Sequence, residues 1–112
     1  MMNVNELNRA LNGTIIAGIG GADREITGGY CCDFLSFVIG KAKENDAWIT
    51  VIGNLNTIAV ASLADVGCII LAENSPLDDD ATIKANDEEI PVIRCEDTAF
   101  YLCAKVAKLL GL

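Results

Sequence analysis

Short apolar runs alternate along the chain with stretches in which apolar residues recur every three or four positions. The runs predict strands because they are rich in Ile, Val and Ala, and they cover residues 14–17, 29–32, 47–52, 68–72 and 91–95. The stretches with helical spacing cover residues 3–11, 34–43, 57–64, 78–89 and 98–110. Residues 22–28 follow neither pattern.

Strand and helix alternate from residue 47 to the end of the chain. Right-handed crossovers of this kind make neighbouring strands parallel and place helices on both faces of a sheet. The sequence therefore predicts an α/β fold of three layers, α/β/α, with a mostly parallel central sheet of about five strands. Residues 68–72 are the most apolar run and should lie at the sheet centre. A chain of 112 residues has room for one core, so we expect a single domain over 1–112.

Residue types that begin and end helices flank the helical stretches. The predicted N-caps are Asn3 or Asn5, Asp33, and Asn56 or Thr57. Gly13 and Gly67 are predicted to end the first and third helices. Carboxylates at 78–80 favour the start of the fourth. The last helix is predicted to bury a stripe made of Phe100, Cys103, Val106, Ala107 and Leu110.

The charge balance excludes several partners. Eight Lys and Arg against sixteen Asp and Glu give a net charge of -8, and without a basic cluster we expect neither nucleic acid nor an anionic membrane to bind. No apolar run approaches the roughly 18 residues that span a bilayer, and the polar N-terminal residues lack the apolar core of a signal peptide. Five cysteines in apolar settings then predict free thiols and a cytoplasmic location.

The residue types also argue against catalysis. The chain has no His, which is the commonest general base and triad partner. Gly18–Gly21 follows a strand but lacks the Lys and Ser or Thr of a phosphate-binding loop, so a plain turn is the favoured interpretation. Cys31 and Cys32 are adjacent and should point to opposite faces of a strand, and no cysteine pair has the spacing of metal ligands. We expect no catalytic residue, no metal and no cofactor.

Two groups of residues are candidates for ligand binding. The first group is Asp23, Arg24, Thr27, Gly28 and Gly29. An Arg side chain binds a carboxylate or phosphate through two parallel hydrogen bonds, and glycines let the backbone approach a ligand closely. The alternative is an Asp–Arg ion pair that braces an irregular loop, and the residues alone favour this brace.

The second group is Asn54, Asn56 and Thr57, which follow the strand at 47–52. Ligands of open α/β sheets bind at the carboxyl ends of the strands. Helix capping explains the same residues without a ligand, and it is favoured for each of them taken singly. Residues 73–75 follow the next strand and should lie at the same edge. We expect the two groups to lie near each other on one rim of the sheet.

Residues 23–29, Asp-Arg-Glu-Ile-Thr-Gly-Gly, resemble the motif after which the DRTGG domain family is named. The resemblance extends over nearly the whole chain through residues 47–51, residues 54–61 and the apolar strand at Cys68. It implies a regulatory module of the kind that occurs beside CBS domains in pyrophosphatases and in phosphate acetyltransferase-like proteins. It also implies a fold similar to the N-terminal domain of HPr kinase/phosphorylase. Kinase activity is not implied, because the phosphate-binding loop and catalytic half are missing.

Two functions follow from these observations. The first is a non-enzymatic regulatory domain that binds a small anionic metabolite or nucleotide and acts as a homodimer, the dimer being implied by the resemblance. The second is a protein-interaction or assembly module with no small-molecule ligand, which would expose an apolar helix face around Phe100 and Tyr101.

Overall fold

A single five-stranded sheet organises the computed structural model, which describes residues 2–112. In spatial order the strands are β2 (Thr14–Ala17), β7 (Val92–Arg94), β6 (Cys68–Leu71), β5 (Asp46–Thr50) and β4 (Gly28–Cys31). Strands β4 to β7 are parallel to one another, and β2 is antiparallel to β7. The predicted mostly parallel sheet is confirmed, and β6 lies at its centre as its apolar sequence predicted.

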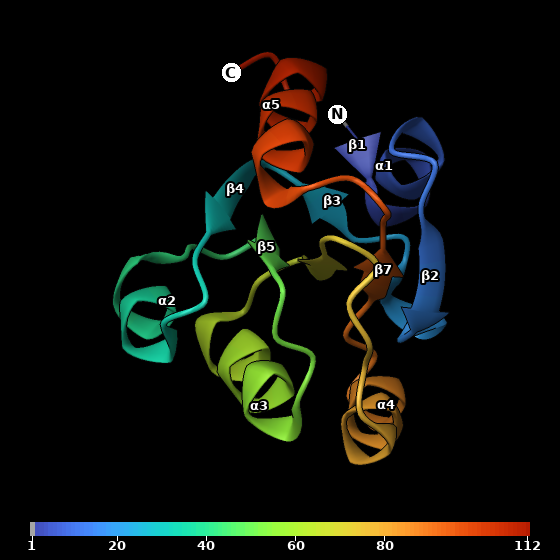
Figure 1. Cartoon of the computed structure of the whole chain (residues 1–112), viewed down its shortest axis with the longest axis vertical. Coiled ribbons are helices and arrows are strands. Elements are labelled where there is room, and N and C mark those ends of the chain that lie inside the picture. The colour runs from blue at the N-terminus through green and yellow to red at the C-terminus, as the bar shows by residue number, and fades with distance from the viewer. Residues whose placement is uncertain (1) are drawn as a thin grey trace.

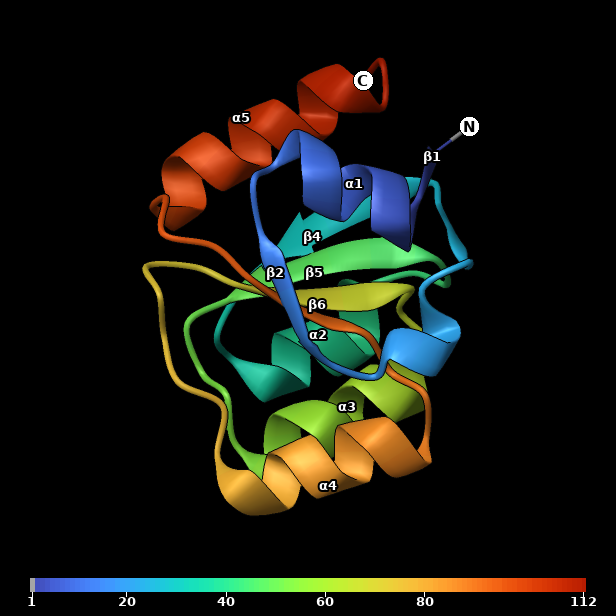
Figure 2. The ribbon, with the colours of Figure 1, turned by 90° about the vertical axis from the view of Figure 1, so that its right-hand side faces the viewer.

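Helices cover both faces of the sheet and complete the three predicted layers (Figure 1). On one face lie α1 (Val4–Ala10) and α5 (Ala99–Leu109), and on the other lie α2 (Leu35–Lys41), α3 (Leu55–Ala64) and α4 (Asp79–Asp87). Figure 2 shows the two helical layers above and below the strands. Within residues 2–112, no helix combines the length and apolar character needed to cross a membrane.

A small second sheet joins the N-terminus to the irregular segment after β2. It pairs β1 (Met2–Asn3) with β3 (Glu25–Ile26) in antiparallel orientation, and a 3-10 turn, η1 (Ile19–Gly21), precedes β3. These strands of two residues each were not predicted, because so short a segment carries no periodic signal. They hold the segment that contains Arg24 against the start of the chain, where Val4 N donates a hydrogen bond to Arg24 O at 3.0 Å.

The central strands are buried on both faces because their side chains alternate between two cores. Trp48 and Ile69 pack in the cluster with α3 and α4, whereas Ile49 and Ile70 pack in the cluster with α1 and α5. The indole Nε1 of Trp48 donates to Cys32 O at 2.9 Å, so the buried ring leaves no polar atom unsatisfied. Burial of both faces explains why these strands are continuous apolar runs in the sequence.

The N-terminal caps agree with the prediction at α1 and differ from it at α3. Asn3 accepts a hydrogen bond from Glu6 N at 2.8 Å, and the Glu6 carboxylate accepts one from Asn3 N, which forms a capping box. The cap of α3 is Asn54 rather than the predicted Asn56 or Thr57. The helix starts earlier than its apolar pattern indicated.

Asp33 was predicted to cap α2, and this prediction is wrong. Phe34 occupies the cap position without a side-chain hydrogen bond. The Asp33 carboxylate instead accepts hydrogen bonds from Thr50 Oγ1 at 2.7 Å and from Val51 N at 3.1 Å. Because β4 and β5 are parallel, Asp33 reaches the donors at the end of β5.

The predicted glycine ends of two helices are also wrong. The left-handed residues after α1 and α3 are Asn12, with φ 54°, and Asp65, with φ 56°. Asn and Asp are the side chains that tolerate this conformation best after Gly. Gly13 and Gly67 meet a packing requirement instead, because a Cβ on either would come within 2.6 Å of an Ile side chain.

The predicted stripe of α5 is partly wrong. Phe100 is 75% exposed, and Leu102, which was not on the stripe, is fully buried. Val106 is buried as predicted, and the other predicted stripe residues are half-buried. Leu102 and Val106 are four residues apart and lie on the face of the helix that meets the sheet.

Gly18 occupies a turn that no other residue can occupy without strain. Its φ is 69°, and a Cβ there would overlap the carbonyl of Ile90. Its N–H donates to Asn86 Oδ1 at 2.8 Å, which docks the turn against the last turn of α4. This agrees with the interpretation of Gly18–Gly21 as a plain turn.

Gly18→Ala should therefore lower the free energy of unfolding by roughly 2 kcal/mol or more. The matched control is Gly40→Ala in α2, where a Cβ meets nothing within 4 Å and where Ala should leave stability unchanged or raise it by up to about 1 kcal/mol. Urea unfolding of both variants measures the difference. Equal losses of stability would contradict the assignment.

Candidate functional site

Arg24 lies at the edge of the sheet where the parallel strands begin. Its Nε donates to Asn45 Oδ1 at 2.7 Å, and one of its terminal nitrogens donates to Asp65 O at 2.7 Å. The same nitrogen lies 2.9 Å from the Asp65 carboxylate. Asn45 directly precedes β5 and Asp65 ends α3, so the guanidinium joins three segments that are distant in sequence.

Both partners of Arg24 have a left-handed backbone. Asn45 has φ 67° and Asp65 has φ 56°, conformations that cost energy for any residue other than Gly. Charge-assisted hydrogen bonds from a rigid guanidinium offset part of that cost. The side chain of Arg24 therefore acts as a brace, although its ion-pair partner is Asp65 and not the neighbouring Asp23, whose side chain is exposed.

The second predicted group lies where the parallel strands end. Asn54 Oδ1 accepts a hydrogen bond from Thr57 N at 3.1 Å, and the buried Thr57 hydroxyl donates to Ile52 O at 2.8 Å. Asn56 is exposed in the first turn of α3. Capping and turn formation account for Asn54 and Thr57 without a ligand.

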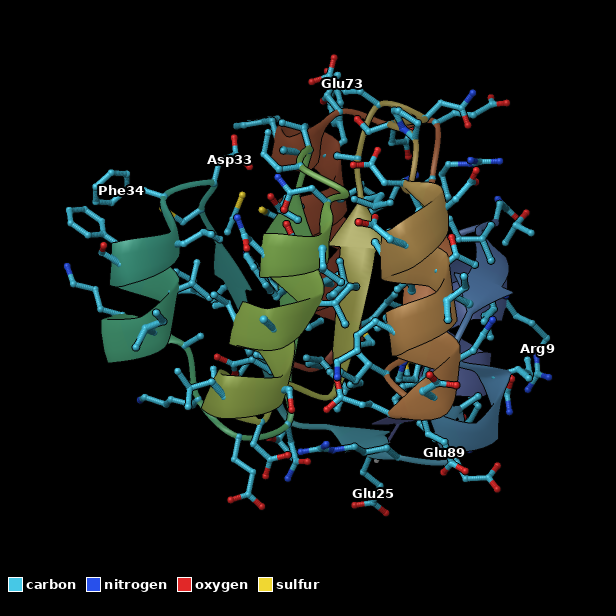
Figure 3. The ribbon with its side chains drawn as sticks, turned by 90° about the horizontal axis from the view of Figure 1, so that it is seen from below. Arg9, Glu25, Asp33, Phe34, Glu73 and Glu89 are labelled. Atoms are coloured by element: carbon cyan, nitrogen blue, oxygen red, sulfur yellow. The ribbon has the colours of Figure 1, made fainter. Side chains whose placement is uncertain are left out.

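The two predicted groups do not share one rim, so that expectation is wrong. Figure 3 shows Glu25, the neighbour of Arg24, on the opposite side of the molecule from Asp33 and Glu73, which follow β4 and β6. The reason is topological. Arg24 precedes the parallel strand β4, whereas Asn54 follows the parallel strand β5.

Part of the first group lies along the open side of β4. This strand pairs with β5 on one side only, so its other side keeps backbone groups without strand partners. A hollow of about 450 Å³ runs beside it, and we call it the edge groove; Thr27, Gly28, Gly29, Lys41 and Lys43 line it. Among the predicted site residues, Thr27, Gly28 and Gly29 are brought together here.

Close packing explains one of the two glycines in the groove. A Cβ on Gly28 would lie 2.7 Å from Asp46 Oδ1. Asp46 is buried, and its other oxygen accepts a hydrogen bond from Lys43 N at 2.8 Å. Gly29 is under no such constraint, since a Cβ there would make only ordinary contacts.

Two cations line the groove, and two aromatic rings lie on the helix that carries one of them; none of the four was predicted from the sequence as a site residue. Lys41 Nζ lies 4.8 Å from the centroid of the Phe37 ring, and Phe37 packs edge-to-face with Phe34 at 5.1 Å. Within residues 2–112, neither Lys41 nor Lys43 forms an ion pair. The available signal was the spacing of Phe34, Phe37 and Lys41, which places them on one face of a helix whose buried face is elsewhere.

Burial makes three of the five cysteines unsuited to nucleophilic chemistry. Burial raises the pKa of the Cys68 thiol to about 12 and that of Cys95 to about 11. Desolvation, together with a hydrogen bond to Cys103, raises the pKa of Cys31 to about 12. The thiolate is the nucleophilic and metal-binding form, and these three thiols are protonated at neutral pH.

Cys31 and Cys32 point to opposite faces of the sheet, as predicted. Cys31 lines a small apolar cavity of about 240 Å³ with Cys103 of α5, whereas Cys32 packs against the cluster that contains Trp48. In the described part of the chain, no three His, Cys, Asp or Glu side chains gather closely enough to hold a metal ion.

Comparisons with known proteins identify a fold and no family. No family model matches the chain, and no curated protein matches it in sequence. Among solved structures, it is similar to the CBS and DRTGG domains of the regulatory region of Clostridium perfringens pyrophosphatase, which was solved with its activator, diadenosine tetraphosphate. The TM-score is 0.70 at 11% sequence identity, over 93% of this chain and 45% of that one.

This similarity establishes a DRTGG-like fold, in agreement with the resemblance of residues 23–29. The chain spans less than half of the neighbour's length. The neighbour belongs to a regulatory region, whereas the sequence identity is too low to carry its ligand over to this chain.

The brace assignment predicts that Arg24→Gln lowers the free energy of unfolding by about 1–3 kcal/mol, because Asn45 and Asp65 lose their partner. Arg24→Lys should recover only part of the loss, since an ammonium cannot bond both partners in the same geometry. The control is Arg9→Gln on the exposed side of α1, with an expected change within about 0.5 kcal/mol. Chemical unfolding measures all three. If Arg24→Gln is as stable as Arg9→Gln, the side chain is not a brace.

Proposed function

We propose that this chain is a non-enzymatic regulatory domain that binds a small anionic metabolite or nucleotide in the edge groove and acts as a homodimer. The observation that carries the ligand proposal is the pair Lys41 and Lys43, which face the groove without a carboxylate partner in residues 2–112. In a chain of net charge -8, unpaired cations beside a hollow are the favoured place for an anionic group.

The groove offers the contacts that a phosphate or carboxylate needs. The two ammonium groups supply charge, the Thr27 hydroxyl is a donor, and the exposed Gly29 lets a ligand approach the strand backbone closely. Phe34 and Phe37 are 60% and 50% exposed, and an exposed ring is a surface on which a base stacks. Glu44 and the buried Asp46 also line the groove, so a ligand with few negative charges is favoured over a highly charged one.

The solved neighbour supports a regulatory role. That neighbour is part of a regulatory region and was solved with a nucleotide activator. In this chain, the raised thiol pKa values remove Cys31, Cys68 and Cys95 as nucleophiles at neutral pH. The five free cysteines suit the reducing cytoplasm that we propose as the location.

The open side of β4 is the surface that we propose for the homodimer. An unpaired edge strand is a template for a second strand, and a twofold axis would place β4 antiparallel to its copy. The exposed Leu112 lines the groove beside this strand, and Phe34 and Phe37 are exposed on α2, the helix that follows it. Because the edge groove follows the same strand, a ligand and a second copy would meet there, which would couple binding to assembly.

A second candidate function, assembly without a small ligand, is favoured by a separate observation. Phe100 and Tyr101 are 75% and 60% exposed on α5, and their rings pack edge-to-face at 5.4 Å. Large exposed aromatic residues mark interaction surfaces. This surface lies on the helix that the sequence analysis named for the assembly module.

Thermal unfolding with ADP, ATP or acetyl phosphate tests the ligand. At about 100 times the dissociation constant, a ligand adds roughly 2.7 kcal/mol of stability, which is a rise of several degrees in Tm for a domain of this size. The double variant Lys41→Gln/Lys43→Gln should abolish the rise. Lys84→Gln on α4, which removes one positive charge outside the groove, should retain it. No rise with any of the three compounds would favour assembly without a ligand.

Light scattering at micromolar concentration tests the dimer and should give the mass of two chains. Cys31→Lys places a charge on β4 and should reduce the mass to that of one chain, because lysine on an edge strand prevents pairing. Phe100→Ser should leave the dimer intact. The opposite pattern would place the interface on α5, and a mass of one chain for the unchanged protein would refute dimerisation.

A further inference from the structure

A second hollow lies where β7 ends, on the face of the sheet that carries α1 and α5. Its volume is about 340 Å³, and we call it the rim pocket; Thr14, Asn74, Arg94, Glu96, Asp97 and Lys105 line it. These residues come from the start of β2, the loop after β6, the end of β7, the loop that follows it, and α5. None of them belongs to the edge groove, which follows β4 at the other border of the sheet.

Arg94 is the unusual member of this pocket. It stands on an inner strand, where its residue partners are Thr14 on β2 and Leu71 on β6. The residue is half-buried, yet in residues 2–112 its guanidinium has no ion pair and no hydrogen bond. The nitrogens of the guanidinium are therefore available to a ligand, and a carboxylate would supply two acceptors in parallel.

The rim pocket also contains a carboxylate that can bind a ligand cation. Lys105 Nζ binds the Asp97 carboxylate, so this pair is neutral, whereas the exposed Glu96 forms no ion pair among the described residues. The pocket therefore presents one free cation, Arg94, and one free carboxylate, Glu96.

The walls of the pocket are held in place by the backbone. Glu73 and Asn74 both have left-handed φ values, 56° and 55°. Their N–H groups donate to Asp97 O at 2.9 Å and to Cys95 O at 2.8 Å, which ties the loop after β6 to the loop after β7. Strained residues that neighbouring hydrogen bonds hold in position are common at ligand sites.

The charge pattern selects the class of ligand. A polyphosphate would gain Arg94 but would be repelled by Glu96, and a diamine would gain Glu96 but would be repelled by Arg94. A molecule with one carboxylate and one ammonium group satisfies both free charges. Apart from Leu11, the rest of the lining is polar, with the Thr14 hydroxyl and the amides of Asn12 and Asn74, so a polar side chain is favoured on the ligand.

From this arrangement we propose that the rim pocket binds a free polar α-amino acid, with its carboxylate on Arg94 and its ammonium group on Glu96. This site is separate from the edge groove and does not depend on the function proposed for it.

The test uses the full chain labelled with nitrogen-15 and follows its amide signals during titration with free amino acids up to about 10 mM. A polar amino acid should shift the signals of Asn74, Arg94 and Asp97 and leave those of Thr27 and Lys43 in place. Succinate, which lacks the amine, and putrescine, which lacks the carboxylate, should bind about tenfold or more weakly. Binding of succinate as tight as that of the amino acid would overturn the proposal, as would the absence of shifts with every amino acid.

Two variants test the contribution of each charge to binding separately. Arg94→Gln should weaken the amino acid and succinate alike by about tenfold or more, whereas Glu96→Gln should weaken the amino acid by a similar factor and leave succinate unchanged or tighter. Glu96 is exposed, so its variant should fold normally and keeps the test decisive if Arg94→Gln proves unstable. Lys84→Gln is the control and should bind like the unchanged protein. Equal binding by Glu96→Gln and the control would show that the pocket does not recognise the amine.

Discussion

Burial of β5 and β6 on both faces is the constraint on which the rest of the structure depends. Trp48, Ile49, Ile69 and Ile70 are almost completely inaccessible to solvent and alternate between the two cores. Two-sided burial requires helices above and below the sheet, and helices on both faces require crossovers between parallel strands. The parallel arrangement then assigns each loop to one of two opposite edges, according to whether it precedes or follows its strand.

Because of this arrangement, the residues that resemble the DRTGG motif lie in different surroundings and have different roles. Arg24 precedes β4 and stabilises the left-handed turns at Asn45 and Asp65, so its importance is structural. Gly28 is required by the approach of Asp46. Of the residues in this segment, Thr27 and Gly29 are left as candidates for ligand binding in the edge groove. A motif of this kind therefore combines residues with different physical roles, and a shared name does not make them one site.

Because basic residues are outnumbered in this acidic chain, the positions of its few cations indicate where an anionic group could bind. Half of the eight basic residues line either the edge groove or the rim pocket. Near Lys41 and Lys43 the backbone edge and exposed rings favour a small anion or a second copy, whereas at Arg94 nearby carboxylates favour a zwitterion. Neither hollow is lined by a cysteine, and the chain has no His. Both surfaces suit recognition.

The sequence by itself determined the layers and the sheet, because apolar runs and helical spacing report burial directly. It placed β6 at the centre and predicted the brace at Arg24 as the favoured alternative. Only the tertiary structure decided which polar residues meet. Asp33 bonds to Thr50, Arg24 bonds to Asp65, and Arg94 stands unpaired beside Glu96. These relations join residues from different elements, and short-range patterns along the chain carry no information on distances across a fold.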